Sequence, residues 1–157
     1  PALSGSRHAA TVHGSMSRFY LAYGSNLWHA QMASRCPGAS LAATLVLPGW
    51  RLVVRRYALV VADPAAHCPV ALWRVTEAHM AALDRFEGHP TCYRRDRIAL
   101  PGPVQGEAGA WIYHDVSCRA GPPPAAYVAR LRDGYRDCGF DPAPLETALA
   151  AWPAAGP

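Results

Sequence analysis

Short runs of apolar and β-branched residues, separated by glycine, proline and polar residues, divide most of this chain into candidate strands. Branched and aromatic side chains fit a pleated, partly buried surface, so such runs are typical of strands. Turns or loops are expected where the pattern is interrupted, at Pro48-Gly49, at residues 63–67 and at residues 101–106. The runs predict six strands, at residues 19–23, 41–47, 50–61, 70–75, 93–100 and 109–116.

Apolar residues at helical spacing predict helices between and after these strands. The clearest begins at Thr76, turns Met80, Leu83 and Phe86 toward the core, and ends at Gly88. The other helices are expected to begin near Leu27, with Ser25 or Asn26 as the cap, and to span residues 127–138 and 145–152. Strands with interspersed helices and short loops predict an α+β domain with a curled, largely antiparallel sheet.

Length and composition fit one folded domain. The chain has 157 residues, of which 51% are hydrophobic and 17% charged, enough to bury a sizeable core. Residues 1–15 are small, polar and His-containing and end in Gly14-Ser15 just before Met16, a pattern typical of a vector-derived leader. We therefore expect a single domain over residues 16–157. No apolar run approaches the ~20 residues that a membrane-spanning helix needs.

Charge and cysteine content exclude some function classes. The net charge is +4, but the basic residues are dispersed and form no dense block of the kind that binds nucleic acid. The five cysteines are odd in number and contain no CxxC pair, which favours a reducing, cytoplasmic setting over a disulfide framework. Some histidines and cysteines lie close together in sequence, but no pair repeats at a ligand-like spacing. We expect neither a metal site, nor nucleic acid or membrane binding.

A small polar loop follows the first strand and is the first candidate site. Tyr23-Gly24-Ser25-Asn26 leads from a strand into a helix, so its backbone N–H groups can bind an anion or a carbonyl oxygen. From the spacing alone, an ordinary strand-to-helix turn explains the loop equally well.

Glu87 is the second candidate. It lies four and seven residues after Leu83 and Met80 and so shares their core-facing side of the helix. Burial and the helix C-terminal dipole both disfavour the ionised carboxylate, which raises its pKa toward the range useful for proton transfer. The alternative is a Glu87 that extends into solvent or pairs with Arg94 or Arg95. The sequence shows no Ser/His/Asp order, nucleophile elbow, phosphate-binding loop or dinucleotide fingerprint.

The polar loop and the helix end with Glu87 occur here in the same order and spacing as in a known family, and the sequence resembles the γ-glutamylcyclotransferase (AIG2-like) superfamily. Y-G-S-N followed by L-D-x-x-E-G and then a tyrosine is a specific combination, and Y-G-S-N is similar to the dipeptide-type branch. The chain departs from relatives at Ala71, where a glycine is usual, and in residues 139–142, which lack a tyrosine that some relatives have. The matching segments are residues 20–27, 35–39, 47–52, 72–76, 83–88, 93–95 and 111–113.

The resemblance implies a small mixed, largely antiparallel β-barrel with flanking helices and a pocket at its mouth. It implies that Glu87 is the catalytic acid/base, and that no cofactor takes part. The expected reaction is intramolecular: the α-amine of a γ-glutamyl amide attacks the δ-carbonyl, which releases 5-oxoproline and a free amine or amino acid. The substrate-binding residues that the resemblance implies are Tyr23, Gly24, Ser25, Asn26, Leu27, Tyr93 and Tyr113.

Two other functions stay open at this point. One is a tailoring enzyme that removes a γ-glutamyl group from a biosynthetic intermediate, and the other is a non-catalytic binding module that keeps the fold. The expected partner is a small γ-glutamyl molecule, and a homodimer is possible, since relatives include dimers.

Overall fold

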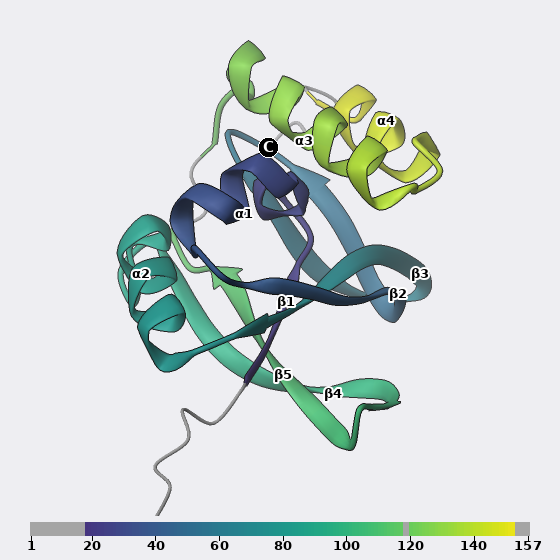
Figure 1. Cartoon of the computed structure of the whole chain (residues 1–157). Coiled ribbons are helices and arrows are strands. Elements are labelled where there is room, and N and C mark those ends of the chain that lie inside the picture. The colour runs from purple at the N-terminus through teal and green to yellow at the C-terminus, as the bar shows by residue number, and fades with distance from the viewer. Residues whose placement is uncertain (1–17, 118–119, 153–157) are drawn as a thin grey trace, which may run out of the picture.

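The computed structural model describes residues 18–117 and 120–152 (Figure 1). Residues 1–15, expected to be a leader, lie outside the described residues. The elements, in chain order, are β1 (Arg18–Ala22), a 3-10 turn η1 (Ser25–Leu27), α1 (His29–Arg35), β2 (Ser40–Val54), β3 (Ala58–Val75), α2 (Glu77–Glu87), β4 (Tyr93–Val104), β5 (Glu107–Asp115), α3 (Ala125–Cys138) and α4 (Ala143–Ala150).

The strands form one mixed, largely antiparallel sheet in the order β2-β3-β1-β5-β4. The short central strand β1 pairs antiparallel with β3, where Tyr20 lies opposite Trp73, and parallel with β5, where it lies opposite Trp111. The α+β class and the flanking helices are therefore confirmed. The expected closure into a barrel is not observed, because the edge strands β2 and β4 pair with β3 and β5 and not with each other.

The strand count is five rather than six, because the chain reverses at a different place from the one expected. The run at residues 50–61 is not one strand: β2 ends at Val54 and β3 begins at Ala58, with a turn closed by Arg55 N–H donating to the Tyr57 carbonyl. Apolar residues continue on both sides of this turn and so conceal the reversal. The long β2–β3 hairpin is visible at the right of Figure 1.

The breaks expected at Pro48-Gly49 and at residues 63–67 are absorbed within these strands. A register shift between Pro48 and Trp50 accommodates Gly49, whose φ of +82° suits glycine. Asp63 instead pairs with Arg51 of the neighbouring strand, at 3.2 Å. Residues 101–104 likewise extend β4, and the turn narrows to Gln105-Gly106.

Helix α2 begins and ends where the sequence predicts. The Thr76 hydroxyl accepts from His79 N–H, and His79 Nδ1 accepts in return from Thr76 N–H, which caps the first turn. Gly88 ends the helix with a φ of +65°. The expectation for Phe86 is wrong, since it is 56% exposed. Seven residues are nearly two full turns, so Glu87 lies almost over buried Met80, whereas Phe86 is rotated away by about a third of a turn.

Tight helix packing holds the turn after β1 in place. A Cβ at Gly134 of α3 would lie 2.6 Å from Leu27 Cβ and 2.8 Å from Trp28 N, so α3 approaches this turn as closely as a glycine permits. Neither η1 nor α1 has a side-chain cap, and the prediction that Ser25 or Asn26 caps a helix is wrong. Both side chains instead take part in a polar network described below.

Among the described helices, none combines the length and apolar character needed to cross a membrane.

Candidate active site

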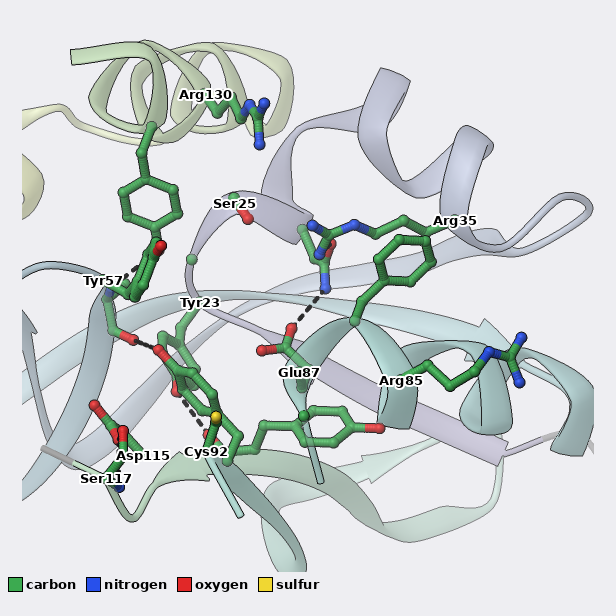
Figure 2. Close-up of a pocket in the computed structure, with 18 of the residues that line it drawn as sticks. Tyr23, Ser25, Arg35, Tyr57, Arg85, Glu87, Cys92, Asp115, Ser117 and Arg130 are labelled. Carbon is green, nitrogen blue, oxygen red and sulfur yellow. Dashed lines mark hydrogen bonds between the residues drawn. The ribbon is translucent and has the colours of Figure 1, made fainter. Parts of the chain in front are cut away.

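A pocket of about 400 Å³ opens where the turn after β1 meets the C-terminal end of α2, strands β4 and β5, and helix α3 (Figure 2). Glu87 lies in its centre, with Ser25 and Arg130 above it and Asp115 and Ser117 on the opposite side in this view. Seven of the eight site residues expected from the sequence line the pocket, namely Tyr23, Gly24, Ser25, Asn26, Glu87, Tyr93 and Tyr113.

Leu27 is the expected site residue that does not line the pocket. Its side chain is completely buried, on the side of the turn that packs against α3 at Gly134. Its backbone N–H donates to the Gly24 carbonyl at 3.0 Å and is therefore not available to a ligand. Leu27 supports the turn from beneath, which explains why an apolar residue follows the polar loop.

The geometry of the turn leaves backbone donors at the pocket. The bond from Leu27 N–H to the Gly24 carbonyl closes a single 3-10 turn, whose first N–H groups, at Ser25 and Asn26, have no partner within the turn. Gly24 passes close to the opposite wall: a Cβ there would lie 3.2 Å from Ala58 Cβ and 3.4 Å from the Tyr127 hydroxyl. The absence of a side chain at Gly24 keeps this part of the pocket open.

Asn26 connects the turn to Glu87. It is only 3% exposed, and its Nδ2 donates to Glu87 Oε1 at 3.3 Å and to the Tyr20 hydroxyl at 2.9 Å. Its Oδ1 accepts from Gln31 Nε2 at 2.9 Å and from Arg35 Nη1 at 3.2 Å. Asn26, expected from the sequence to lie in the polar loop after the first strand, is thus the centre of a buried hydrogen-bond network.

Burial raises the pKa of Glu87 from 4.5 to about 7, an effect that the nearby Arg35 guanidinium partly opposes. Burial was one of the two causes expected from the sequence, and it is the dominant one. The alternative pairing does not occur: Arg94 pairs with Asp96 at 3.4 Å and Arg95 with Asp84 at 3.6 Å. A carboxyl group with this pKa exchanges protons readily at neutral pH.

The tyrosines wall the pocket with their rings while their hydroxyls bind the protein. Tyr23 donates to the Tyr113 carbonyl at 2.6 Å, and Tyr113 donates to Asp84 Oδ1 at 2.7 Å. Tyr93 donates to the Ala58 carbonyl at 2.8 Å. These bonds fix the shape of the pocket and explain the positions of Tyr93 and Tyr113 better than direct polar contact with a ligand would.

Several pocket residues were not identified from the sequence. Arg35 follows Gln31 by four residues on α1, so both reach Asn26 from one helix face, a spacing that the sequence does contain. Tyr127 lies at the start of the helix expected over residues 127–138, and its hydroxyl accepts from Ala58 N–H at 2.9 Å beside Gly24. Neither Arg130 nor Tyr57 gave a local signal, because only the packing of α3 and the hairpin turn brings them to the pocket.

Comparison with known proteins agrees with this fold. One solved structure, a "Gamma-glutamyl cyclotransferase", is 21% identical with a TM-score of 0.71, over 86% of this chain and 87% of its own. An uncharacterised protein from Homo sapiens gives 21% and 0.71, over 85% and 87%. YkqA from Bacillus subtilis gives 17% and 0.70, over 87% of this chain and 55% of its own. At these identities the likeness concerns the fold.

The family is shown by sequence. No functionally curated protein matches the chain. A family model described as "Gamma-glutamyl cyclotransferase, AIG2-like" matches residues 20–127, which include the turn after β1, all of α2 with Glu87, and both pocket strands β4 and β5. The chain therefore belongs to the γ-glutamyl cyclotransferase, AIG2-like family.

Proposed function

We propose that this protein releases 5-oxoproline from a γ-glutamyl amide by intramolecular cyclisation, with Glu87 as the general acid/base. The observation that carries the proposal is the Glu87 carboxyl group, which has a pKa of about 7 and lies in a pocket of about 400 Å³ beside the Gly24–Asn26 turn. No nucleophile from the protein is required, because the substrate carries its own amine.

Glu87 moves protons between the two nitrogens of the substrate. In its ionised form it takes a proton from the α-ammonium group, and the amine then attacks the δ-carbonyl carbon. A five-membered ring forms, the bond to the leaving nitrogen breaks, and the electron pair of that bond stays on the leaving nitrogen. In total two protons leave the α-nitrogen and two reach the leaving amine, so Glu87 ends in its starting form.

The turn after β1 would stabilise the negative charge that develops on the substrate oxygen during this reaction. The N–H groups of Ser25 and Asn26 are suited to stabilise the oxyanion of the tetrahedral intermediate. The rings of Tyr23, Tyr93 and Tyr113 confine the γ-glutamyl chain, which favours the folded conformation needed for ring closure. The similarity of Y-G-S-N to the dipeptide-type branch supports a γ-glutamyl amino acid as substrate.

The test is 5-oxoproline release, followed by mass spectrometry, from a panel of γ-glutamyl dipeptides and γ-glutamyl amines. Wild-type protein is expected to release 5-oxoproline from at least one dipeptide, and Glu87→Gln from none. Equal release by both proteins would overturn the role of Glu87. No release from any panel member would favour a retained binding fold or a larger specialised γ-glutamyl substrate.

A further inference from the structure

The Asn26 amide uses every hydrogen-bonding position it has. An asparagine side chain offers two N–H donors and two acceptor positions on its oxygen. Here the donors go to Glu87 and Tyr20, and the acceptors receive Gln31 and Arg35. Exchange of the amide oxygen and nitrogen would turn the oxygen toward the Glu87 carboxylate and the nitrogen toward the guanidinium, so one orientation is strongly favoured.

Arginines at both ends fix the direction of this network, because a guanidinium group can only donate. Arg35 Nη1 donates to Asn26 Oδ1 at 3.2 Å, which places the Asn26 amino group on the side of Glu87. At the other end, Arg130 Nη1 donates to Gln31 Oε1 at 3.5 Å, so Gln31 Nε2 faces Ser25 and Asn26. Each amide is therefore oriented by a cation that cannot accept.

The position of Arg35 is itself fixed by α2. Its guanidinium carbon lies 4.5 Å from the centre of the Phe86 ring, which is the exposed aromatic residue next to Glu87. Such cation–aromatic contacts hold an arginine over the ring face. The exposed Phe86 ring thus holds the Arg35 guanidinium group, a contact that the helical pattern did not predict.

We propose that Arg35 is a positioning residue for the proton transfer at Glu87, acting through Asn26. It keeps an Asn26 N–H on Glu87 Oε1, and the other carboxylate oxygen, Oε2, is in this proposal the one that exchanges protons with the substrate. Figure 2 shows the bond to Oε1 and the second oxygen directed into the pocket. This inference rests on the proposed function only for its kinetic consequence.

The electrostatic surroundings of Glu87 give Arg35 a second effect. The guanidinium group lowers the pKa of Glu87, against the larger effect of burial. Burial raises the pKa of the tyrosines around it, so they stay neutral at physiological pH. The charged and titratable residues of the pocket are Tyr20 on β1, Tyr23 after it, Arg35 on α1, Tyr57 in the hairpin turn, Arg85 on α2, Cys92 before β4, Tyr93 on β4, Tyr113 and Asp115 on β5, and Tyr127 and Arg130 on α3.

The first test measures the titration of Glu87 without any substrate. Protein labelled with carbon-13 at the side-chain carboxyl of glutamate has four such groups, Glu77, Glu87, Glu107 and Glu146, and the Glu87→Gln variant identifies the Glu87 signal. Wild-type Glu87 is expected to titrate near pH 7. Arg35→Met should titrate about one pH unit higher, because the nearest cation is lost. Arg35→Lys, which keeps the charge and a donor, should titrate close to wild type.

The matched control is Arg94→Met, the same substitution at an arginine that pairs with Asp96 outside the pocket. It is expected to leave the Glu87 titration unchanged. An Arg35→Met protein that is folded by circular dichroism and titrates like wild type would overturn the proposal. So would an Arg35→Lys protein that titrates as high as Arg35→Met.

The second test divides binding from proton transfer. With the best substrate of the panel, Arg35→Met is expected to lower kcat by about tenfold or more, to change KM by less than about threefold, and to move the acidic limb of the pH–rate profile upward. Arg35→Lys should restore most of kcat. A variant that raises KM alone, with kcat and the pH profile unchanged, would make Arg35 a substrate-binding residue and overturn the proposal. Absence of 5-oxoproline release by the wild type would count against the proposed function for the panel substrates, whereas the titration still decides the role of Arg35.

Discussion

Two carboxyl groups on the last turns of α2, three residues apart, have different surroundings. Asp84 pairs with Arg95 at 3.6 Å and accepts a hydrogen bond from the Tyr113 hydroxyl at 2.7 Å. Among the described residues Glu87 forms no ion pair, and its Oε1 accepts an Asn26 amide N–H at 3.3 Å. Asp84 therefore connects α2 to strands β4 and β5, whereas the Glu87 side chain lines the pocket.

The two groups share the same carboxylate chemistry and differ in their surroundings. Burial disfavours the ionised form of a carboxyl group, and it is the main cause that raises the pKa of Glu87 to about 7. Asp84 stabilises the wall of the pocket, and Glu87 faces the space that the wall encloses.

The largest effect is expected when the Glu87 carboxyl group is replaced by an amide, and the same replacement at Asp84 provides the comparison. Glu87→Gln should lower kcat by about 10² to 10⁴-fold, the usual contribution of a general acid/base, and leave the fold intact. Asp84→Asn should keep kcat within about tenfold, since its group acts on the wall and not on the substrate. Rates of 5-oxoproline release, compared at one pH, provide the measurement. Similar losses in the two variants would contradict the division of roles.

The next largest effect concerns the turn opposite Glu87. Gly24→Val adds a branched side chain where even a Cβ lies 3.2 Å from Ala58 Cβ, so the pocket narrows without any change to either carboxyl group. We expect kcat/KM to fall by about 10²-fold, the scale of a misplacement of about 1 Å. The Glu87 titration should persist in this variant. Wild-type kcat/KM would show that the turn does not hold the substrate.

The pH dependence of stability separates the two groups further. The pKa of Glu87 rises from 4.5 to about 7 on folding, so the folded state binds its proton more tightly, and the free energy of unfolding falls as pH rises between these values. Glu87→Gln should therefore be more stable than wild type at pH values above about 7, by on the order of 1–3 kcal/mol, and similar to it below about pH 4.5. Urea unfolding at both pH values measures the difference. A constant difference across pH would mean that the carboxyl group has the same pKa in both states.

The smallest expected effect is the stability loss in Asp84→Asn. The amide oxygen still accepts from the Tyr113 hydroxyl, but the ion pair with Arg95 is lost. Because both side chains are partly exposed, we expect a loss of about 1 kcal/mol in the free energy of unfolding. Urea unfolding of Asp84→Asn beside wild type gives the value. A gain in stability would show that the desolvation free energy of the Asp84–Arg95 pair exceeds its electrostatic attraction.

Local sequence signals predicted the elements that carry the site. Thr76 and Gly88 set the ends of α2, because a side-chain cap and a left-handed glycine act within one turn of the helix. The seven-residue spacing from Met80 placed Glu87 on the buried side, since helix geometry alone fixes that relation. Of the eight site residues expected from the sequence, seven line the pocket.

The tertiary structure decided what lies between distant parts of the chain. The turn at residues 55–57 was hidden because apolar residues continue on both sides of Arg55-Arg56, and only strand pairing reveals the reversal. Leu27 turned away from the pocket because α3 packs against it, and Arg35 reached Asn26 because η1 and α1 fold against α2. The sequence by itself thus determined the family, the ends of α2 and the position of Glu87 on the same helix face as Met80. The partners and the pKa of that carboxyl group depend on burial and on contacts between segments, which no local pattern encodes.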